Sequence, residues 1–178
     1  MGNVGRAVAE RAVLLGMDVI VHDPMVDDAL VVAVGARPVS WSELLTTSHF
    51  ISVHVAASER TRGLLDDAAF GRMKEGVRLV NCSRGAVVNE EALLQALRTG
   101  KVAAAAMDVF ESEPPFGSPL LEMPQFIATP HLVSSTFEAQ IAVAAELAEQ
   151  VRDFFVSGEV RGIVNPEVLE GPETESKS

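Results

Sequence analysis

Three short polar segments, each directly after an apolar run, contain the side chains best suited to chemistry. Arg84 follows the first of these runs, and His131 follows the third. Between them, Asp108 and Glu113 follow the second run. A guanidinium can bind a carboxylate through two parallel hydrogen bonds, and an imidazole can transfer a proton at neutral pH. Together with a carboxylate, these groups suit redox chemistry on a 2-oxo or 2-hydroxy acid.

A second candidate site lies at the start of the chain. Residues Gly2-Asn3-Val4-Gly5 resemble the end of a G-x-G-x-x-G phosphate-binding loop whose first glycine and leading strand are absent. In such a loop the backbone N–H groups at a helix N-terminus bind a pyrophosphate. An ordinary helix start remains an alternative explanation for the G-x-x-G spacing.

Asp23 adds to this signal because it ends an apolar run 18 residues after Gly5, close to the spacing of about 20 residues for a ribose-binding acid. Its carboxylate would accept hydrogen bonds from ribose hydroxyls and repel a 2′-phosphate, which favours NAD over NADP. A turn residue before Pro24 is the alternative interpretation of Asp23.

Short apolar runs alternate with amphipathic segments along most of the chain. Strands are expected at residues 19–21, 50–53, 77–80, 102–107 and 126–128, and helices at residues 3–15, 42–45, 66–73, 90–98 and 136–155. This alternation predicts an α/β protein with a parallel sheet covered on both faces. Because parallel strands end at one edge of the sheet, the three polar segments are expected to meet there.

Composition narrows the possible partners. The chain has 178 residues, 14 Lys and Arg, and 25 Asp and Glu, which gives a net charge of −11. The excess of acidic over basic residues argues against nucleic-acid binding, which needs a basic surface. No apolar run is long enough to suggest a membrane partner. A single cysteine, Cys82, excludes an internal disulfide and favours a cytoplasmic location.

Three motifs carry a family resemblance: NCSRGAVVNEEAL around Arg84, AMDVFESEPP around Glu113, and TPHLVSST around His131. In this order and spacing they resemble the cofactor-binding half of the D-isomer-specific 2-hydroxyacid dehydrogenases, and within that family the phosphoglycerate dehydrogenase-like branch. The resemblance implies an NAD-dependent oxidoreductase acting on the CH–OH group of a D-2-hydroxy acid. The specific acid is not indicated by the sequence.

The resemblance also implies roles for individual residues. Arg84 would bind the substrate carboxylate and carbonyl, His131 would be the general acid/base, and Glu113 would orient the imidazole. Asp108 would contact the nicotinamide carboxamide, and no metal is required. The full set of implied cofactor-binding positions is Gly2, Asn3, Val4, Gly5, Asp23, Val55, Cys82, Ser83 and Asp108.

The same resemblance suggests how the chain is organised. Residues 1–133 would be a Rossmann-type, doubly wound NAD-binding domain that lacks its first strand. Residues 134–166 would be a long C-terminal crossover helix and a return segment of the substrate domain, and residues 167–178 a disordered tail. We expect upstream residues in a longer protein to supply the strand and most of a substrate domain, and the full-length form to be a homodimer.

Two other functions remain possible from the sequence. The chain could be a non-catalytic module that binds NAD(H) or another protein, or an inactive truncated fragment. Retention of Arg84, Glu113 and His131 together favours the enzyme over the module, whereas the missing strand favours an inactive fragment.

Overall fold

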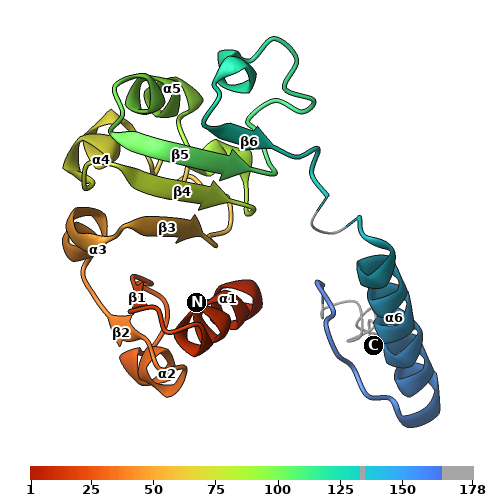
Figure 1. The fold of residues 1–178 in the computed structure, drawn as a ribbon. Helices are drawn as coiled ribbons and strands as arrows, with labels where there is room; N and C mark the ends of the chain where they lie inside the picture. Colours follow the sequence, from red (N-terminus) through yellow and green to blue (C-terminus); the bar gives the residue numbers. More distant parts are fainter. Residues whose placement is uncertain (133–134, 166–178) are drawn as a thin grey trace, which may run out of the picture. The chain divides into compact units, whose positions relative to one another are not determined.

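The computed structural model describes residues 1–132 and 135–165, which belong to two compact units, Met1–Val133 and Ser134–Ser178 (Figure 1). The predicted tail at residues 167–178 lies outside the described residues. Within the described part of the chain, no helix combines the length and apolar character that crossing a bilayer requires.

A four-stranded parallel sheet organises the first unit. Its strands follow the order β3 (Phe50–Val53), β4 (Val77–Asn81), β5 (Val102–Met107) and β6 (Phe126–Ala128). One row of the register runs Ile51, Leu79, Ala105 and Phe126. Because all pairs are parallel, the four strands end at the same edge of the sheet. The predicted α/β class and parallel sheet are confirmed.

Three helices pack against this sheet: α3 (Trp41–Thr47), α4 (Asp67–Arg72) and α5 (Glu90–Arg98). Helix α4 contacts both α3 and α5, and α5 contacts β5. The residue before each helix caps it, since the side chains of Ser40, Asp66 and Asn89 accept hydrogen bonds from backbone amides three residues later at 3.2, 2.8 and 2.9 Å.

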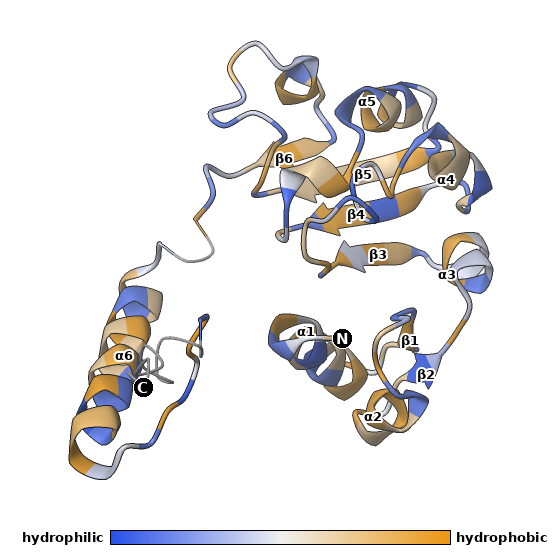
Figure 2. Ribbon diagram, turned by 180° about the vertical axis from the view of Figure 1, so that it is seen from behind, coloured by the Kyte–Doolittle hydropathy of each residue, from blue (hydrophilic) through white to orange (hydrophobic). Residues whose placement is uncertain are grey.

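Alternating burial along the strands forms the core between sheet and helices. Strand β4 buries Val77, Leu79 and Asn81, while Arg78 and Val80 lie on the other face. Leu93 and Leu97 of α5 pack into the same cluster with almost no exposed surface. Figure 2 shows mainly apolar strands and one polar and one apolar face on α5.

The first 40 residues form a separate layer. Helix α1 (Asn3–Leu14) leads to β1 (Ile20–Val21), and α2 (Asp28–Ala33) leads to β2 (Arg37–Pro38). Strands β1 and β2 pair in parallel as a sheet of their own, which has no hydrogen-bonded strand in common with the four-stranded sheet. Helix α1 is the first element of the described residues.

Helix α2 and strand β2 were not predicted from the sequence. Both are short, six and two residues, and β2 contains Pro38, which cannot donate to a strand ladder. The helix is nevertheless capped, because the Asp27 side chain accepts a hydrogen bond from the Ala29 amide at 2.8 Å.

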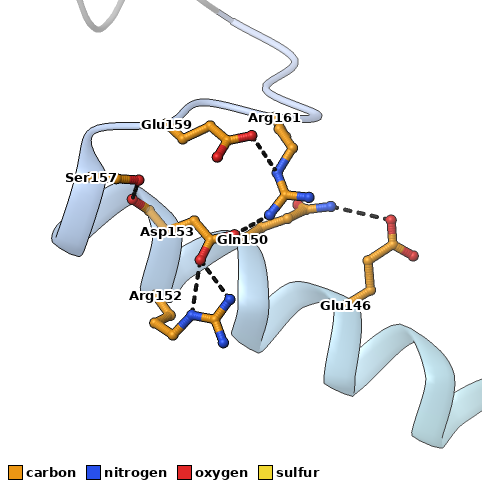
Figure 3. Close-up of polar contacts among 7 residues, drawn as sticks. All are labelled: Glu146, Gln150, Arg152, Asp153, Ser157, Glu159 and Arg161. Atoms are coloured by element: carbon orange, nitrogen blue, oxygen red, sulfur yellow. Dashed lines mark hydrogen bonds and ion pairs between the residues drawn. The ribbon is translucent and has the colours of Figure 1, made fainter.

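In the second unit, helix α6 (Phe137–Ser157) is preceded by the capping residue Thr136 and followed by Gly158, which has a left-handed φ of 70°. The segment after Gly158 turns back, and the guanidinium of Arg161 pairs with the carboxylate of Asp153 (Figure 3). Arg161 also pairs with Glu159 at 3.3 Å. The long helix predicted at residues 136–155 is confirmed.

Candidate active site

The loop after β4 positions Arg84 through its neighbour Asn81. The Asn81 side chain is fully buried. Its amide oxygen accepts hydrogen bonds from the Ser83 amide at 3.0 Å and the Ser83 hydroxyl at 2.8 Å, and its amide nitrogen donates to the Arg84 carbonyl at 3.0 Å. The exposed Arg84 guanidinium donates to the Ser83 carbonyl at 2.7 Å. The backbone around Arg84 is therefore fixed, while its charged group remains at the surface.

Gly85 links this loop to the loop after β5. A Cβ atom on Gly85 would lie 2.0 Å from the carbonyl carbon of Phe110 and 2.1 Å from its oxygen. No side chain fits at that distance, because the obstructing atoms belong to the backbone. The close approach holds the Arg84 loop against the segment that leads to Glu113.

Glu113 and His131 form a hydrogen-bonded pair across two loops. The Nδ1 atom of His131 lies 2.7 Å from Oε2 of Glu113, and the other carboxylate oxygen, Oε1, accepts a hydrogen bond from the Phe110 amide at 3.0 Å. The hydrogen bonds from His131 and Phe110 lower the pKa of Glu113. An ionised carboxylate can only accept hydrogen bonds, so Nδ1 carries the proton of the pair and a neutral His131 has its lone pair on Nε2.

Asp108 supports the loop that carries His131. It is 3% exposed and accepts hydrogen bonds from the Thr129 hydroxyl and, at 2.8 Å, from the Leu132 amide. These contacts flank His131, whose φ of 54° lies in the left-handed region. A non-glycine residue in this region requires support from its surroundings. The contacts with Asp108 therefore define where the imidazole is placed.

Three of the predicted cofactor residues line a cavity of about 700 Å³, whereas Gly2, Asn3 and Val4 are not among its lining residues. Gly5, Asp23 and Val55 line it together. A Cβ on Gly5 would lie 3.3 Å from Cβ of His54, so α1 packs closely on the end of β3. Asp23 pairs with the Met1 ammonium and accepts a hydrogen bond from the Met25 amide at 2.9 Å.

The N-terminus of α1 is suited to an anion. Its capping residue, Gly2, offers no side-chain hydrogen bond, and the first turn contains no acidic residue. The first turn of α1 therefore contributes no carboxylate that would oppose an anion at the positive end of the helix dipole. Gly2, Asn3 and Val4 are exposed, as a pyrophosphate site would require.

Residues 1–133 match the family model of the D-isomer specific 2-hydroxyacid dehydrogenase, NAD binding domain. The chain belongs to this family. The D-isomer 2-hydroxyacid dehydrogenase resemblance that the three motifs suggested is thus confirmed over the whole first unit.

Curated relatives support the assignment. The chain is 42% identical over 165 residues to the D-3-phosphoglycerate dehydrogenase of Bacillus subtilis and 40% identical over 169 residues to that of Homo sapiens. These matches cover 93% and 95% of this chain but 31% and 32% of the relatives. The chain therefore spans about a third of the length of these dehydrogenases.

Solved structures of the family have the same fold. A glyoxylate reductase from Paecilomyes thermophila superposes with a TM-score of 0.83 at 36% identity, over 94% of this chain and 51% of that one. A D-lactate dehydrogenase from Aquifex aeolicus, complexed with NAD and lactic acid, superposes with a TM-score of 0.76 at 30% identity. The match covers 86% of this chain and 51% of that one.

Cys82, in the loop after β4, is exposed. Desolvation and the nearby Asp108 carboxylate raise the pKa of its thiol, which disfavours the thiolate that a nucleophile needs. Among the residues of known placement, no group of three or more His, Cys, Asp or Glu side chains could hold a metal ion.

Two positioning residues were missed by the sequence analysis. Asn81 holds the Arg84 loop, and Thr129 binds Asp108 beside His131. Asn81 was detectable as a polar residue at the end of an apolar strand, since a buried amide at such a position needs partners. Thr129 gave no comparable signal, because a threonine before a proline is common in loops.

Proposed function

We propose that this chain is the cofactor-binding and catalytic part of an NAD-dependent D-2-hydroxyacid dehydrogenase of the phosphoglycerate dehydrogenase-like type. The observation that carries the proposal is the hydrogen bond between His131 and Glu113 on the loops after β6 and β5. It sets the imidazole for proton transfer at the same sheet edge as Arg84. The family assignment and the retained motifs support it.

His131 acts as the general base when the substrate is oxidised. Its Nε2 atom takes the hydroxyl proton, and the Glu113 carboxylate stabilises the imidazolium that results. In the reverse direction the same Nε2 returns the proton to the carbonyl oxygen. NAD, when bound, supplies the acceptor for the hydride that leaves C2 of the substrate.

Arg84 binds the substrate. Its planar guanidinium can contact a carboxylate with two hydrogen bonds, which fixes the orientation of the neighbouring C2 atom. The Asn81 contacts and the close packing at Gly85 keep this loop in place. In the absence of substrate the guanidinium satisfies one donor on the Ser83 carbonyl.

The remaining predicted residues would bind NAD. The amides of Gly2, Asn3, Val4 and Gly5 face the pyrophosphate at the N-terminus of α1, and Asp23 accepts hydrogen bonds from the adenosine ribose. The loops that contain Val55, Cys82 and Ser83 would border the cofactor. Asp108 fixes the nicotinamide end, directly or through the loop that it supports.

Turnover tests the catalytic roles. The purified chain is mixed with NAD and, separately, phosphoglycerate, lactate, glycerate and erythronate phosphate, and NADH formation is followed by absorbance. We expect His131→Gln to lower kcat by about 10²–10⁴-fold. The matched control is His49→Gln, because His49 contacts Lys74 at 2.7 Å and precedes β3, at the opposite end of the strand from the loops with the proposed catalytic residues. Equal rates for His131→Gln and the unmodified chain would contradict the catalytic role.

Cofactor binding is tested separately by titrating NADH and NADPH while nicotinamide fluorescence is measured. We expect NADH to bind more tightly, and Asp23→Ala to reduce this preference. Binding of NADH without oxidation of any 2-hydroxy acid would favour the non-catalytic module, and no binding would favour an inactive fragment.

Self-association is the last part of the proposal. Helix α6 has no buried residue, and the side chains of Val143, Leu147 and Val151 on it are 65%, 58% and 49% exposed. An apolar surface of this kind favours association of two copies. We expect Leu147→Glu to shift the chain from dimer to monomer in sedimentation velocity, whereas Glu146→Gln leaves the distribution unchanged.

A further inference from the structure

In the loop after β5, the peptide bond between Phe110 and Glu111 is held by contacts from other segments. The Glu111 amide donates a hydrogen bond to Oε1 of Glu90 at 2.8 Å. Glu90 is the first residue of α5. A side chain at the start of this helix therefore reaches the loop on which Glu113 lies.

The same peptide bond packs against the Arg84 loop. A Cβ on Gly85 would lie 2.0 Å from the Phe110 carbonyl carbon and 2.5 Å from the Glu111 nitrogen. This packing limits how far the peptide bond can move toward the Arg84 loop. It does not define where the Glu111 amide points, because glycine has no polar side chain. The hydrogen bond to Glu90 supplies that direction.

A further contact of Glu111 comes from the loop after β3. Nη1 of Arg62 lies 3.2 Å from Oε1 of Glu111, and the two side chains are 60% and 63% exposed. Solvent screening makes such an exposed ion pair weak. A hydrogen bond from a backbone amide to a carboxylate is stronger than one between neutral groups. Of the two polar contacts of Glu111, the one with Glu90 is therefore better suited to fixing the loop.

The position of Glu111 bears directly on the His131–Glu113 pair. The Phe110 amide donates to Oε1 of Glu113 at 3.0 Å, and Oε2 of Glu113 lies 2.7 Å from Nδ1 of His131. Phe110 and Glu113 lie on either side of Glu111 in the sequence. The turn that they close therefore moves with Glu111, and both hydrogen bonds of the Glu113 carboxylate depend on where Glu111 is held.

We propose that Glu90 is a positioning residue for the acid/base pair. Its carboxylate holds the Glu111 amide and thereby keeps the Glu113 carboxylate within hydrogen-bond distance of His131. The inference rests on the proposed function, because that function gives the pair its role in proton transfer. The dependence of Glu113 on Glu90 can nevertheless be measured without turnover.

Glu91 provides a matched control, because it shares the place of Glu90 on the helix but has a different partner. Both residues lie in the first turn of α5, where a carboxylate interacts favourably with the helix dipole. The Glu91 side chain accepts a hydrogen bond from Nε2 of Gln95 on the same helix at 2.8 Å. Loss of either carboxylate is expected to affect the helix similarly, whereas only loss of Glu90 frees the Glu111 amide.

The first measurement is the pKa of Glu113, obtained by an NMR pH titration of its carboxyl carbon in the full 178-residue chain. The hydrogen bonds from His131 and Phe110 lower this pKa. Glu90→Ala releases the turn that forms them, so we expect the Glu113 pKa to rise. Loss of the negative charge of Glu90 acts in the opposite direction, because it would lower the pKa of a neighbouring carboxyl group. A rise therefore reports lost positioning rather than lost charge.

Glu90→Gln separates the hydrogen bond from the charge. The glutamine amide oxygen can still accept from the Glu111 amide. We therefore expect the Glu113 pKa in Glu90→Gln to stay at or below its value in the unmodified chain. Glu91→Ala is likewise expected not to raise it.

The second measurement is turnover with NAD and the 2-hydroxy acid that the unmodified chain oxidises. We expect Glu90→Ala to lower kcat about tenfold with little change in KM, because the acid/base pair is displaced while Asn81 still holds the Arg84 loop. Glu90→Gln and Glu91→Ala are expected to retain the kcat of the unmodified chain.

Several outcomes would overturn the positioning role of Glu90. One is a Glu113 pKa that falls or stays unchanged in Glu90→Ala, and another is an equal rise in Glu91→Ala. Equal loss of kcat in Glu90→Gln and Glu90→Ala would also contradict it, since the retained hydrogen-bond acceptor would then have no effect. If the unmodified chain oxidises no 2-hydroxy acid, the proposed function fails, and the pKa comparison alone decides whether Glu90 positions Glu113.

Discussion

Within the first unit, residues 1–44 bury far fewer apolar side chains than the residues from Leu45 onward. All residues of the main hydrophobic cluster lie between Leu45 and Leu120. Residues 1–44 contribute only Ala9, Val31 and Ala36 to the buried apolar set, and these three lie outside that cluster. In the same region Leu14 and Leu15 are 85% and 81% exposed.

This difference separates the proposed catalytic residues from the proposed cofactor loop. Arg84, Glu113 and His131 follow strands of the well-packed sheet, whereas Asp23 and the glycine loop belong to the sparsely packed layer beside the cavity of about 700 Å³. Local stability follows buried apolar contacts. We therefore expect the catalytic loops to be held more firmly than the adenosine end of the site.

The largest effect is expected at Gly85, where the well-packed part is tightest. Gly85→Ala places a methyl group 2.0 Å from the Phe110 carbonyl carbon, so the backbone must move. We expect a loss of more than about 3 kcal/mol in the free energy of unfolding, measured by urea denaturation. Gly71→Ala is the control, since nothing lies within 4 Å of its Cβ position. It lies in α4, and alanine there should stabilise by about 0.5–1 kcal/mol. Equal effects would mean that the Gly85 contact is absent in solution.

A pair of leucines tests the comparison directly. Leu93 is fully buried in the cluster, while Leu14 is 85% exposed on α1. Leu93→Ala removes buried side-chain atoms and leaves a cavity, so we expect it to destabilise by about 3 kcal/mol. Leu14→Ala should change stability by less than about 0.5 kcal/mol. Urea denaturation gives both values, and a large loss for Leu14→Ala would show that residues 1–44 pack more closely than the structure indicates.

Sequence patterns predicted the well-packed part better than the sparse one. Residues 50–53, 102–107 and 126–128 are strands with the predicted bounds, and α5 has its predicted start and end. Apolar runs and good capping residues specify such elements locally. Helix α2 and strand β2 were missed, because elements of six and two residues give too little periodicity to detect.

In the candidate site, too, some residues were predictable from the sequence and others were not. The His131–Glu113 pair was expected from the family resemblance, and the structure places its atoms 2.7 Å apart. The supporting contacts were not predictable, because they join residues far apart in sequence. Thr129 and the Leu132 amide meet Asp108, and Gly85 meets Phe110, only after the strands have assembled.

Asn81 connects the well-packed sheet to the Arg84 loop, and its removal is expected to have a moderate effect. Asn81→Ala removes the side-chain amide that accepts a hydrogen bond from the Ser83 amide and donates one to the Arg84 carbonyl. Each buried group left unpaired costs about 1–3 kcal/mol. We expect urea denaturation to show a loss in this range and dehydrogenase assays to show a raised KM for the 2-hydroxy acid. Val80→Ala is the control on the same strand, since Val80 is 36% exposed. An unchanged KM would mean that Arg84 does not depend on this support.

The smallest effect on stability is expected at the exposed pair of His131 and Glu113, whose side chains are 46% and 37% exposed. Solvent screening limits what such a pair contributes to folding. Its electrostatic effect is nevertheless measurable, because the His131 hydrogen bond is the main cause of the lowered pKa of Glu113. Since this pKa is lower in the folded than in the unfolded chain, the stabilising contribution is present above the unfolded pKa. It is lost as the pH falls through the folded pKa.

His131→Gln tests this cause. We expect the pKa of Glu113 to rise toward its ordinary value but to stay below it, because the Phe110 amide still donates to Oε1 at 3.0 Å. The measurement is a pH titration of the Glu113 carboxyl carbon by NMR. His49→Gln is the matched control and should leave this pKa unchanged, because the ring of His49 contacts Lys74 instead. An unchanged Glu113 pKa in His131→Gln would show that the loops after β5 and β6 do not meet in solution. The Arg84 loop, which Asn81 holds in place, would then be better ordered than the His131–Glu113 pair.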